Sequence, residues 1–207
     1  MARALAEAYP GPWTPEAIDI PSEPSGRPYA RLAPDAAPMV GFAPGNRLPV
    51  SVSISHTEGH ALCAASPWRA PLGGRPQRVG IDLGRVEPRS RAFLDTFFTE
   101  EECAWLLAAV ARERDIRANL IWCAKEAVLK VLGLGLTVDT HQLNCRPVPG
   151  DAAKWPLVPG DATWRPFIAA CAPTVAPDCA SIRGVWRTFP GLVAALAADE
   201  AAISAEP

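Results

Sequence analysis

The chain has 207 residues, of which 49% are hydrophobic, and a formal net charge of −2. This length and apolar content predict a globular protein that buries a core as one domain or two small lobes, and they exclude a disordered chain. The net charge gives no broad basic surface for nucleic acid, and no apolar run is long enough to span a bilayer, so we expect neither nucleic-acid nor membrane partners. The N-terminus lacks the apolar core of a signal peptide, so we expect a cytoplasmic protein.

Ten of the 23 prolines lie in residues 1–49. Proline fixes φ and removes a backbone donor, so this stretch is predicted to be extended or irregular, either a linker or an arm that wraps the core. Within it, Arg27 lies in a Gly-Arg-Pro turn beside Tyr29, which by itself is typical of a surface turn.

Residues 50–56, VSVSISH, alternate apolar and hydroxyl side chains, which predicts a half-buried strand. The chain then turns, and residues 60–66 are predicted to form the returning strand. His56 and His60 are four positions apart, as in a helical zinc pair, but the glutamate of a zincin motif is missing and Gly59 disfavours a helix between them. We therefore expect no metal binding by these two histidines.

Residues 78–88, RVGIDLGRVEP, predict another strand, in which Val79, Ile81 and Leu83 share one face. Asp82 then lies on the opposite face. A carboxylate in an apolar strand is costly unless it is paired or bound to a metal, so Asp82 is a candidate site residue. The alternative is that Asp82 accepts backbone donors at a strand end.

Helix formers dominate residues 91–132, which contain no proline. Thr99 followed three positions later by Glu102 matches a capping box, which predicts a helix from Thr99 to about Arg114 and gives Glu102 a structural explanation. Asp115 is predicted to cap the next helix.

Residues 120–133, LIWCAKEAVLKVLG, predict a helix that ends at Gly133, a residue suited to a left-handed C-cap. Its apolar face recurs at helical spacing and consists of Leu120, Ala124, Ala127 and Val131. Lys125, Glu126 and Lys130 lie beside this face. Their simplest explanation is an i,i+4 pair of Glu126 and Lys130 on a solvated edge.

The C-terminal part predicts a strand near residues 142–146 and, after a Pro- and Gly-rich loop, three strand-like runs at 167–171, 181–187 and 192–196. The last run is rich in alanine, so a helix is an alternative there. Six cysteines without CxxC or metal-ligand spacing predict reduced, buried thiols. The final residues are expected to fray.

Three of these stretches, VGIDLGRVEP, FFTEEE and WCAKEAVLK, together resemble the 4′-phosphopantetheinyl transferase superfamily. That family is marked by a Gly-Ile/Val-Asp strand and, further along the chain, a Trp/Phe-x-x-Lys-Glu-Ala/Ser-x-x-Lys helix. Here Trp122 follows Asp82 by 40 positions and Glu126 follows it by 44. The strand end ISHTEGHALCAAS and the turn GRPY are similar to the larger, surfactin-synthetase-activating type, so the resemblance covers about residues 26–146.

The resemblance implies an α+β fold in which helices pack on small antiparallel sheets in two pseudo-related lobes. The transferase domain would occupy residues 50–199, with a reduced first lobe at 26–77 and a second lobe at 78–199, and residues 200–207 would be a tail. Residues 1–49 would be an arm or linker.

The resemblance also implies a reaction, the Mg²⁺-dependent transfer of the 4′-phosphopantetheine arm of coenzyme A to a serine of an acyl or peptidyl carrier protein. The carrier changes from its apo to its holo form, and 3′,5′-ADP is released. The alternative is a non-catalytic domain that binds coenzyme A or a carrier protein in a polyketide or fatty-acid synthase assembly. Either reading allows the chain to be part of a larger synthase.

Under the resemblance, Asp82 and Glu126 would bind Mg²⁺, a hard cation that takes carboxylate oxygens together with waters and substrate phosphates. Glu102, Glu126 and Lys130 would be the catalytic residues, with Glu102 as a candidate base for the carrier serine. Lys125 and Lys130 would meet the phosphate charge of coenzyme A.

Arg27 and His56 would contact the nucleotide phosphates, with assistance from Ser55. Two features depart from the larger type. Gly84 stands where that type usually has a glutamate two residues after the strand aspartate, and the N-terminus lacks its early basic segment. We therefore expect the cation to depend on two carboxylates, water and phosphate.

Overall fold

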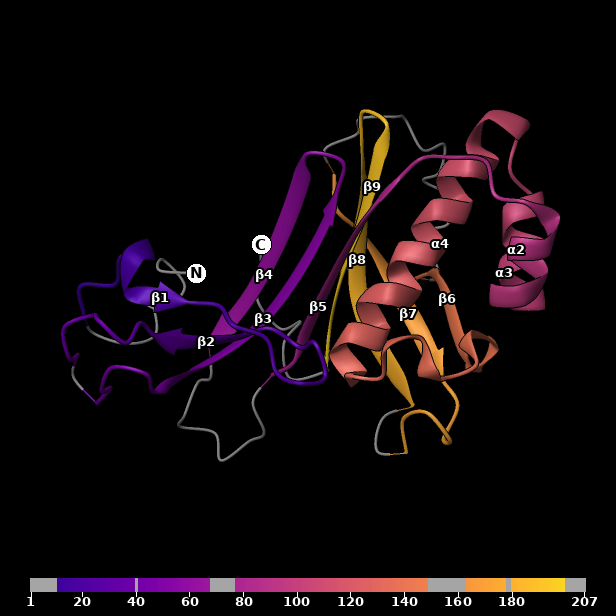
Figure 1. Ribbon diagram of the computed structural model, residues 1–207. Coiled ribbons are helices and arrows are strands. Elements are labelled where there is room, and N and C mark those ends of the chain that lie inside the picture. Colours follow the sequence, from indigo (N-terminus) through magenta and orange to yellow (C-terminus); the bar gives the residue numbers. More distant parts are fainter. Residues whose placement is uncertain (1–10, 40, 68–76, 149–162, 178–179, 200–207) are drawn as a thin grey trace.

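The computed structural model describes residues 11–39, 41–67, 77–148, 163–177 and 180–199. Two antiparallel sheets lie side by side, with β5 at the boundary between them (Figure 1). The first sheet has the strand order β1-β2-β3-β4, and the second has the order β5-β9-β8-β7-β6. This arrangement confirms the α+β fold class. No helix in the described ranges is long and apolar enough to cross a membrane.

The first sheet includes much of the Pro-rich N-terminal segment. A short 3₁₀ turn, η1 (Pro15–Ala17), precedes its strands β1 (Ile18–Asp19), β2 (Tyr29–Leu32), β3 (Arg47–Thr57) and β4 (His60–Pro67). Its small core consists of Trp13, Ala30, Leu32, Leu48, Val50 and Val52. The predicted domain boundary after residue 49 stays a prediction, but the described part of residues 1–49 is packed into this sheet rather than free.

The second sheet carries the helices. Its strands are β5 (Val79–Arg85), β6 (Leu143–Pro147), β7 (Arg165–Cys171), β8 (Ser181–Phe189) and β9 (Leu192–Ala198). The helical elements are α2 (Arg91–Phe97), α3 (Glu100–Leu107), α4 (Ala111–Leu132), η3 (Gly135–Thr137) and η4 (Thr140–Gln142). The long helix α4 crosses the sheet and contacts all five strands, while α3 lies beside α4 and β6 (Figure 1).

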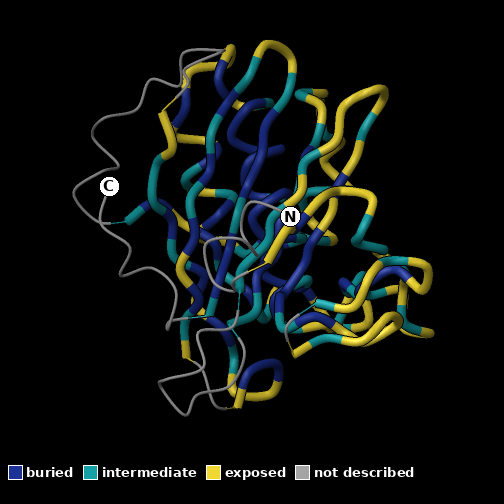
Figure 2. Tube along the Cα trace, turned by 90° about the vertical axis from the view of Figure 1, so that its left-hand side faces the viewer, coloured by how far each residue is buried: buried dark blue, intermediate teal, exposed yellow. Residues whose placement is uncertain are grey.

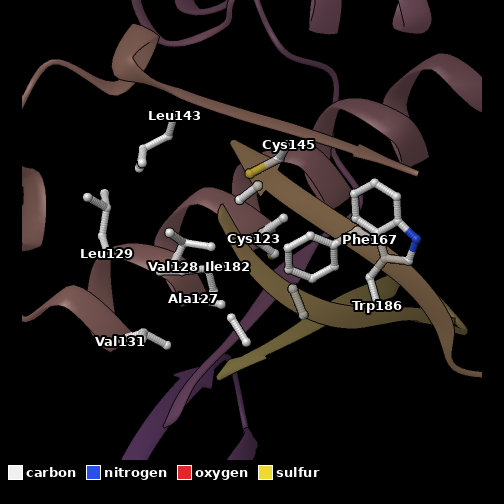
Figure 3. Packing of buried hydrophobic residues seen from close by; sticks show 14 of the residues in the cluster. Cys123, Ala127, Val128, Leu129, Val131, Leu143, Cys145, Phe167, Ile182 and Trp186 are labelled. Atoms are coloured by element: carbon white, nitrogen blue, oxygen red, sulfur yellow. The ribbon is translucent and has the colours of Figure 1, made fainter. Parts of the chain in front are cut away.

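The main core lies between α4 and the second sheet. Figure 3 shows Cys123, Val128 and Leu129 of α4 directed toward side chains of the sheet, among them Phe167 and Trp186. The rings of Phe167 and Trp186 stack with their centroids 5.0 Å apart. Buried residues follow the strands and α4, and exposed residues gather at the turns (Figure 2). This core fixes α4 on the sheet and therefore fixes every side chain that α4 presents to β5.

A glycine permits the close approach of α4 to β5. A Cβ atom on Gly80 would lie 2.0 Å from the carbonyl oxygen of Ala127, a distance that no side chain tolerates. At the C-terminal end of the same helix, Gly133 has φ of +73° and adopts the left-handed cap that the sequence predicts. Both glycines keep α4 in register with β5.

The two sheets meet along a row of serine hydroxyls on β3, which we call the serine ladder (Ser51, Ser53 and Ser55). In an antiparallel edge strand, every second backbone N–H points away from its partner and needs another acceptor. Along β5 these donors are satisfied by the ladder, with N–H to Oγ distances of 3.3 Å for Val79 to Ser51, 3.0 Å for Ile81 to Ser53 and 3.1 Å for Leu83 to Ser55. The alternating hydroxyls of VSVSISH therefore face β5 and not solvent.

The predicted elements are largely confirmed, with two differences around α3. The capping box of Thr99 and Glu102 is present, but α3 ends at Leu107, earlier than predicted. Side chains of α4 explain the break, because Arg114 donates to the carbonyl of Ala109 and Arg117 to that of Trp105. These side chains donate to carbonyl groups at and just beyond the end of α3. In a longer helix, the same carbonyl groups would have accepted backbone N–H groups of the following turn.

The predicted cap at Asp115 is wrong, since α4 begins at Ala111 with Val110 as its N-cap. Helix α2, with the side chain of Ser90 as its N-cap, was not separated in the prediction from the helical region that follows it. The alanine-rich run at 192–196 is a strand, β9, which fills the space between β5 and β8. Small side chains suit that position because α4 lies across it.

The cysteines are only partly buried as predicted. Cys123, Cys145 and Cys171 are buried, whereas Cys63 is exposed on β4 and Cys103 is intermediate. The sixth cysteine, the expected frayed tail at 200–207 and most of the predicted loop at 147–164 lie outside the described residues.

Candidate active site

Asp82 lies where the two sheets and α4 meet. Its carboxylate Oδ1 accepts a hydrogen bond of 2.8 Å from Ser55 Oγ of β3 and one of 2.8 Å from Lys130 Nζ of α4. Only 13% of the Asp82 side chain is exposed. This strand carboxylate is therefore paired, and its partners come from two other elements.

Lys130 joins the same three elements. Its Nζ also donates to the carbonyl of Ile81 on β5 at 2.8 Å and to that of Ile54 on β3 at 3.4 Å. The side chain keeps 31% of its surface exposed, so the ammonium borders solvent at the seam. A partly exposed, fixed positive charge of this kind is suited to an anionic ligand.

Glu126 lies one helical turn before Lys130 and is half-buried. Burial raises the pKa of Glu126 above its ordinary value, the negative charge of Asp82 raises this pKa further, and Lys130 opposes the rise. Asp82 and Glu126 therefore lie close enough for their charges to interact. The simpler explanation of a surface pair between Glu126 and Lys130 does not fit, because Lys130 bonds to Asp82 instead.

Two neighbouring carboxylates at a partly desolvated seam suit a hard divalent cation. Among the described residues no group of three or more His, Cys, Asp or Glu side chains is arranged to hold a metal ion. A cation here would take oxygens from Asp82 and Glu126 and complete its shell with water or ligand oxygens, which is the preference of Mg²⁺.

The space beyond Gly84 is filled by Cys123. A Cβ atom on Gly84 would lie 2.9 Å from the Sγ of Cys123, which is fully buried. The sulfur occupies the position into which a glutamate at 84 would extend. The sequence shows that a carboxylate is missing at position 84, but it does not show that Cys123 fills the space. The small size of Gly84 was the only local indication that another side chain packs there.

Glu102 and Lys125 form a buried pair, which bears on the roles predicted for both residues. Lys125 Nζ lies 2.9 Å from Glu102 Oε2, and both side chains have no exposed surface. Lys125 also donates to two backbone carbonyls, those of Thr140 and Leu143. The predicted contact of Lys125 with phosphate does not fit this geometry, because all of its charge is directed into the interior.

Glu102 is equally enclosed. Its carboxylate accepts the backbone N–H of Thr99 at 2.8 Å and that of Cys145 at 2.7 Å, in addition to Lys125. Burial raises the pKa of Glu102, and Lys125 and the two N–H groups oppose this rise. A carboxylate without solvent contact and with its oxygens engaged does not fit a base for a carrier serine in this arrangement, and the predicted role of Glu102 stays a prediction.

The remaining predicted residues lie around the seam. Ser55 is buried and bonds to Asp82, so it faces the carboxylate and not a phosphate. His56 is exposed at the end of β3, on the strand face opposite Ser55. Arg27 follows the turn at Gly26, which has φ of +83°. The guanidinium reaches α4, since a Cβ on Gly133 would lie 3.6 Å from Arg27 Nη1.

A cleft of about 350 Å³ opens on the first sheet beside Arg27 and the first half of β3. Three guanidinium groups line it, those of Arg27, Arg47 and Arg78, together with Pro28 and the β3 residues Val50, Ser51 and Val52. Arginine forks match phosphate geometry, but Arg47 is paired with Glu23 at 2.8 Å and Arg78 with Asp199 at 3.4 Å, so an anion in the cleft would share these two guanidinium groups with carboxylates. Sequence reasoning found Arg27 but missed Arg47 and Arg78, for which the only signal was their position at the start of β3 and just before β5.

One comparison with known protein families covers the residues of this site. A family model described as the 4′-phosphopantetheinyl transferase superfamily matches residues 78–166. This segment includes β5 and α4 and therefore Asp82, Glu126 and Lys130. This segment, fewer than half of the residues of the chain, is similar to the 4′-phosphopantetheinyl transferase superfamily.

One curated relative and one solved structure give further similarity. The Schizosaccharomyces pombe (strain 972) protein described as L-aminoadipate-semialdehyde dehydrogenase-phosphopantetheinyl transferase is 27% identical over 143 residues, which are 63% of this chain and 51% of the relative. The chain thus spans about half the length of that relative. The crystal structure of Thermotoga maritima holo-[acyl-carrier-protein] synthase is 20% identical and covers 58% of this chain and 61% of its own, with a TM-score of 0.37.

Proposed function

We propose that the protein is a Mg²⁺-dependent 4′-phosphopantetheinyl transferase. It would move the phosphopantetheine arm of coenzyme A to a serine hydroxyl of an acyl or peptidyl carrier protein and release 3′,5′-ADP. The observation that carries this proposal is the meeting of Asp82, Glu126 and Lys130 at the seam, within the segment that matches the superfamily.

The donor set fits the cation that the family implies. Asp82 and Glu126 would hold Mg²⁺, and the substrate pyrophosphate and water would complete its shell. The bound cation would neutralise charge on the pyrophosphate as the bond to ADP breaks. Lys130 borders this place from α4 and would contact the same phosphate oxygens.

In the reaction, the oxygen of the carrier serine forms a bond to the phosphorus that carries pantetheine. The anhydride bond between this phosphorus and the leaving nucleotide breaks, and its electron pair stays on 3′,5′-ADP. The serine proton must pass to a base. Because Glu102 is enclosed, we assign that role to Glu126, which lies at the seam and would act either directly or through a water.

The nucleotide would extend from the seam along the first sheet. The cleft between Arg27, Arg47 and Arg78 offers three guanidinium groups to the phosphates of 3′,5′-ADP. His56, exposed at the end of β3, would supply a further contact. The first sheet would then bind coenzyme A, and the second would supply the carboxylates.

The direct test is the intact mass of an apo carrier protein after incubation with the chain, coenzyme A and Mg²⁺, with an EDTA control. We expect the carrier to gain one phosphopantetheine arm, and we expect the gain to disappear with EDTA. If several carriers gain no mass while calorimetry still detects coenzyme A binding, the transferase is contradicted and a non-catalytic binding domain is favoured. If coenzyme A does not bind either, both functions are contradicted for this chain alone.

A further inference from the structure

The serine ladder contains one member with a second partner. All three hydroxyls accept a backbone N–H of β5, so all three contribute to the seam in the same way. Ser55 alone among them has a described hydrogen bond to a carboxylate, the 2.8 Å bond to Asp82 Oδ1. Ser53 lies two positions earlier on the same strand face, is also buried, and provides a natural comparison.

The direction of the Ser55 hydroxyl is fixed by its neighbours. Its oxygen accepts the N–H of Leu83, and an ionised carboxylate is only an acceptor, so the hydroxyl proton is the one that lies between Ser55 and Asp82. A hydrogen bond of this kind to a charged acceptor is stronger than one between neutral groups. The backbone of β5 therefore orients a side chain of β3, which in turn orients a side chain of β5.

Two donors converge on the same oxygen of Asp82. Ser55 approaches from the first sheet and Lys130 from α4. Lys130 is itself held by backbone carbonyls of both β3 and β5, and Ser55 is held by a backbone N–H of β5. Two donors at fixed positions define the plane of a carboxylate more closely than one does. The orientation of Asp82 thus depends on the contact between the sheets.

We infer that Ser55 is a positioning residue for the cation-binding carboxylate of Asp82. It holds the carboxylate in the orientation in which it binds Mg²⁺, and it makes cation binding on the second sheet depend on the first. This inference rests on the proposed function. It replaces the expected contact of Ser55 with nucleotide phosphate, since the hydroxyl is buried and directed at Asp82.

A purely structural role in the seam is the competing explanation, and the ladder supplies its control. Ser55→Ala and Ser53→Ala each remove one hydroxyl that accepts a buried β5 N–H. Only Ser55→Ala also removes the hydrogen bond to Asp82. Both variants are therefore expected to lower the thermal unfolding temperature in EDTA, Ser55→Ala by the larger amount, and only Ser55→Ala is expected to weaken cation binding.

The experiment is calorimetric titration of the full chain with Mn²⁺, in saturating coenzyme A, for the wild type and for the variants. Loss of a group that orients a metal ligand typically weakens binding about 10- to 100-fold. We expect Ser55→Ala to bind Mn²⁺ at least about tenfold more weakly than the wild type, and Ser53→Ala to stay within about twofold. Ser55→Thr, which restores the hydroxyl, is expected to recover most of the affinity.

Three results would overturn the inference. Equal weakening in Ser55→Ala and Ser53→Ala would assign Ser55 to the seam alone. Failure of a folded Ser55→Thr to recover affinity would exclude the hydroxyl as the cause. Absence of Mn²⁺ binding by the wild type would contradict the proposed cation site itself. This outcome is distinct from the first two, because it is seen in the unmodified chain and not only in a variant.

Discussion

Two lysines of the same helix show how differently one short motif can be used. Lys125 and Lys130 both lie on α4, and each pairs with a carboxylate from another element. The pair of Lys125 with Glu102 has no exposed surface, and backbone groups satisfy its remaining donors and acceptors. The pair of Lys130 with Asp82 keeps exposures of 31% and 13% and lies beside a second carboxylate.

The difference teaches that saturation, and not charge alone, separates a structural pair from a candidate site. A buried pair with complete hydrogen bonding has no capacity for a ligand, and it fixes the contact of α3 with α4 and β6. The pair of Lys130 with Asp82 borders solvent and lies near a second carboxylate, that of Glu126. A cation bound to the carboxylates, or an anion bound to Lys130, would therefore be stabilised there. The predictions below separate the two pairs, from the largest effect to the smallest.

Replacement of Lys125 is expected to have the largest effect, and that effect is on folding. Lys125→Met leaves Glu102 buried and without its counter-charge, which typically costs about 3–5 kcal/mol. The free energy of unfolding in urea measures this change. Lys130→Met is the matched control and should lower the free energy of unfolding by a smaller amount, because its ion pair borders solvent and Ser55 still donates to Asp82.

Equal stability of Lys125→Met and Lys130→Met would contradict the division of roles on α4. The control variant should also lose transfer activity, since its ammonium is the one at the seam. The pair of variants therefore reports stability and activity separately.

Glu126→Gln is expected to lower the rate of transfer by at least about 100-fold with little change in the unfolding temperature. The amide keeps the shape of the side chain but removes the charge that would bind the cation and accept the serine proton. The rate of mass gain by a carrier protein measures the loss. Glu100→Gln, at an exposed carboxylate of α3, is the control, and near-normal activity of Glu126→Gln would remove Glu126 from the site.

Gly84→Glu tests whether Cys123 determines the two-carboxylate site. The new side chain meets the sulfur at its first carbon, and such overpacking typically costs about 1–3 kcal/mol. Adding Cys123→Ala opens the space, so the double variant should recover stability and bind Mn²⁺ more tightly than the wild type. A fully stable single variant would show that the strand yields at this point and that the sulfur does not exclude a third carboxylate.

The smallest effect concerns pH. Glu126 has a folded-state pKa raised above its ordinary value of 4.5, so the folded chain holds this proton at pH values where the unfolded chain has lost it. Stability contributed in this way is present below the ordinary value and is lost as pH rises through the raised pKa. Without metal, the wild type should therefore lose stability relative to Glu126→Gln over that range. Denaturant unfolding in EDTA at several pH values checks this, and a difference that does not change with pH would contradict it.

Much of this arrangement is readable from the sequence. The alternation around Asp82 predicts β5, and the apolar spacing and Gly133 predict the C-terminal part of α4. These features are local patterns, and local patterns are what a single sequence records best. That Asp82 and Glu126 meet is implied by the resemblance to the transferase superfamily.

The roles of Lys125 and Glu102 were not predicted because they depend on the rotation of α4 against α3 and β6. A signal was nevertheless present. Ile121, Lys125 and Leu129 are spaced by four, which places Lys125 within a row of buried apolar residues and not beside it. The capping box likewise gave Glu102 a structural explanation that the family resemblance displaced.

The orientation of the serine ladder and the cleft of three arginines were also beyond the sequence. Alternating serines predict a strand, but nothing local says that the hydroxyl face meets an edge strand from another sheet. Likewise, Arg27, Arg47 and Arg78 come from separate stretches and meet only because the first sheet folds against β5.

The most direct test of the account is the position of the cation. Crystals grown with coenzyme A and Mn²⁺ would give an anomalous difference peak that locates the metal without any assumption about activity. The account predicts one peak within bonding distance of carboxylate oxygens of both Asp82 and Glu126, next to the pyrophosphate. A peak elsewhere, or bound coenzyme A with no metal between these two carboxylates, would contradict the assignment of the site to the seam.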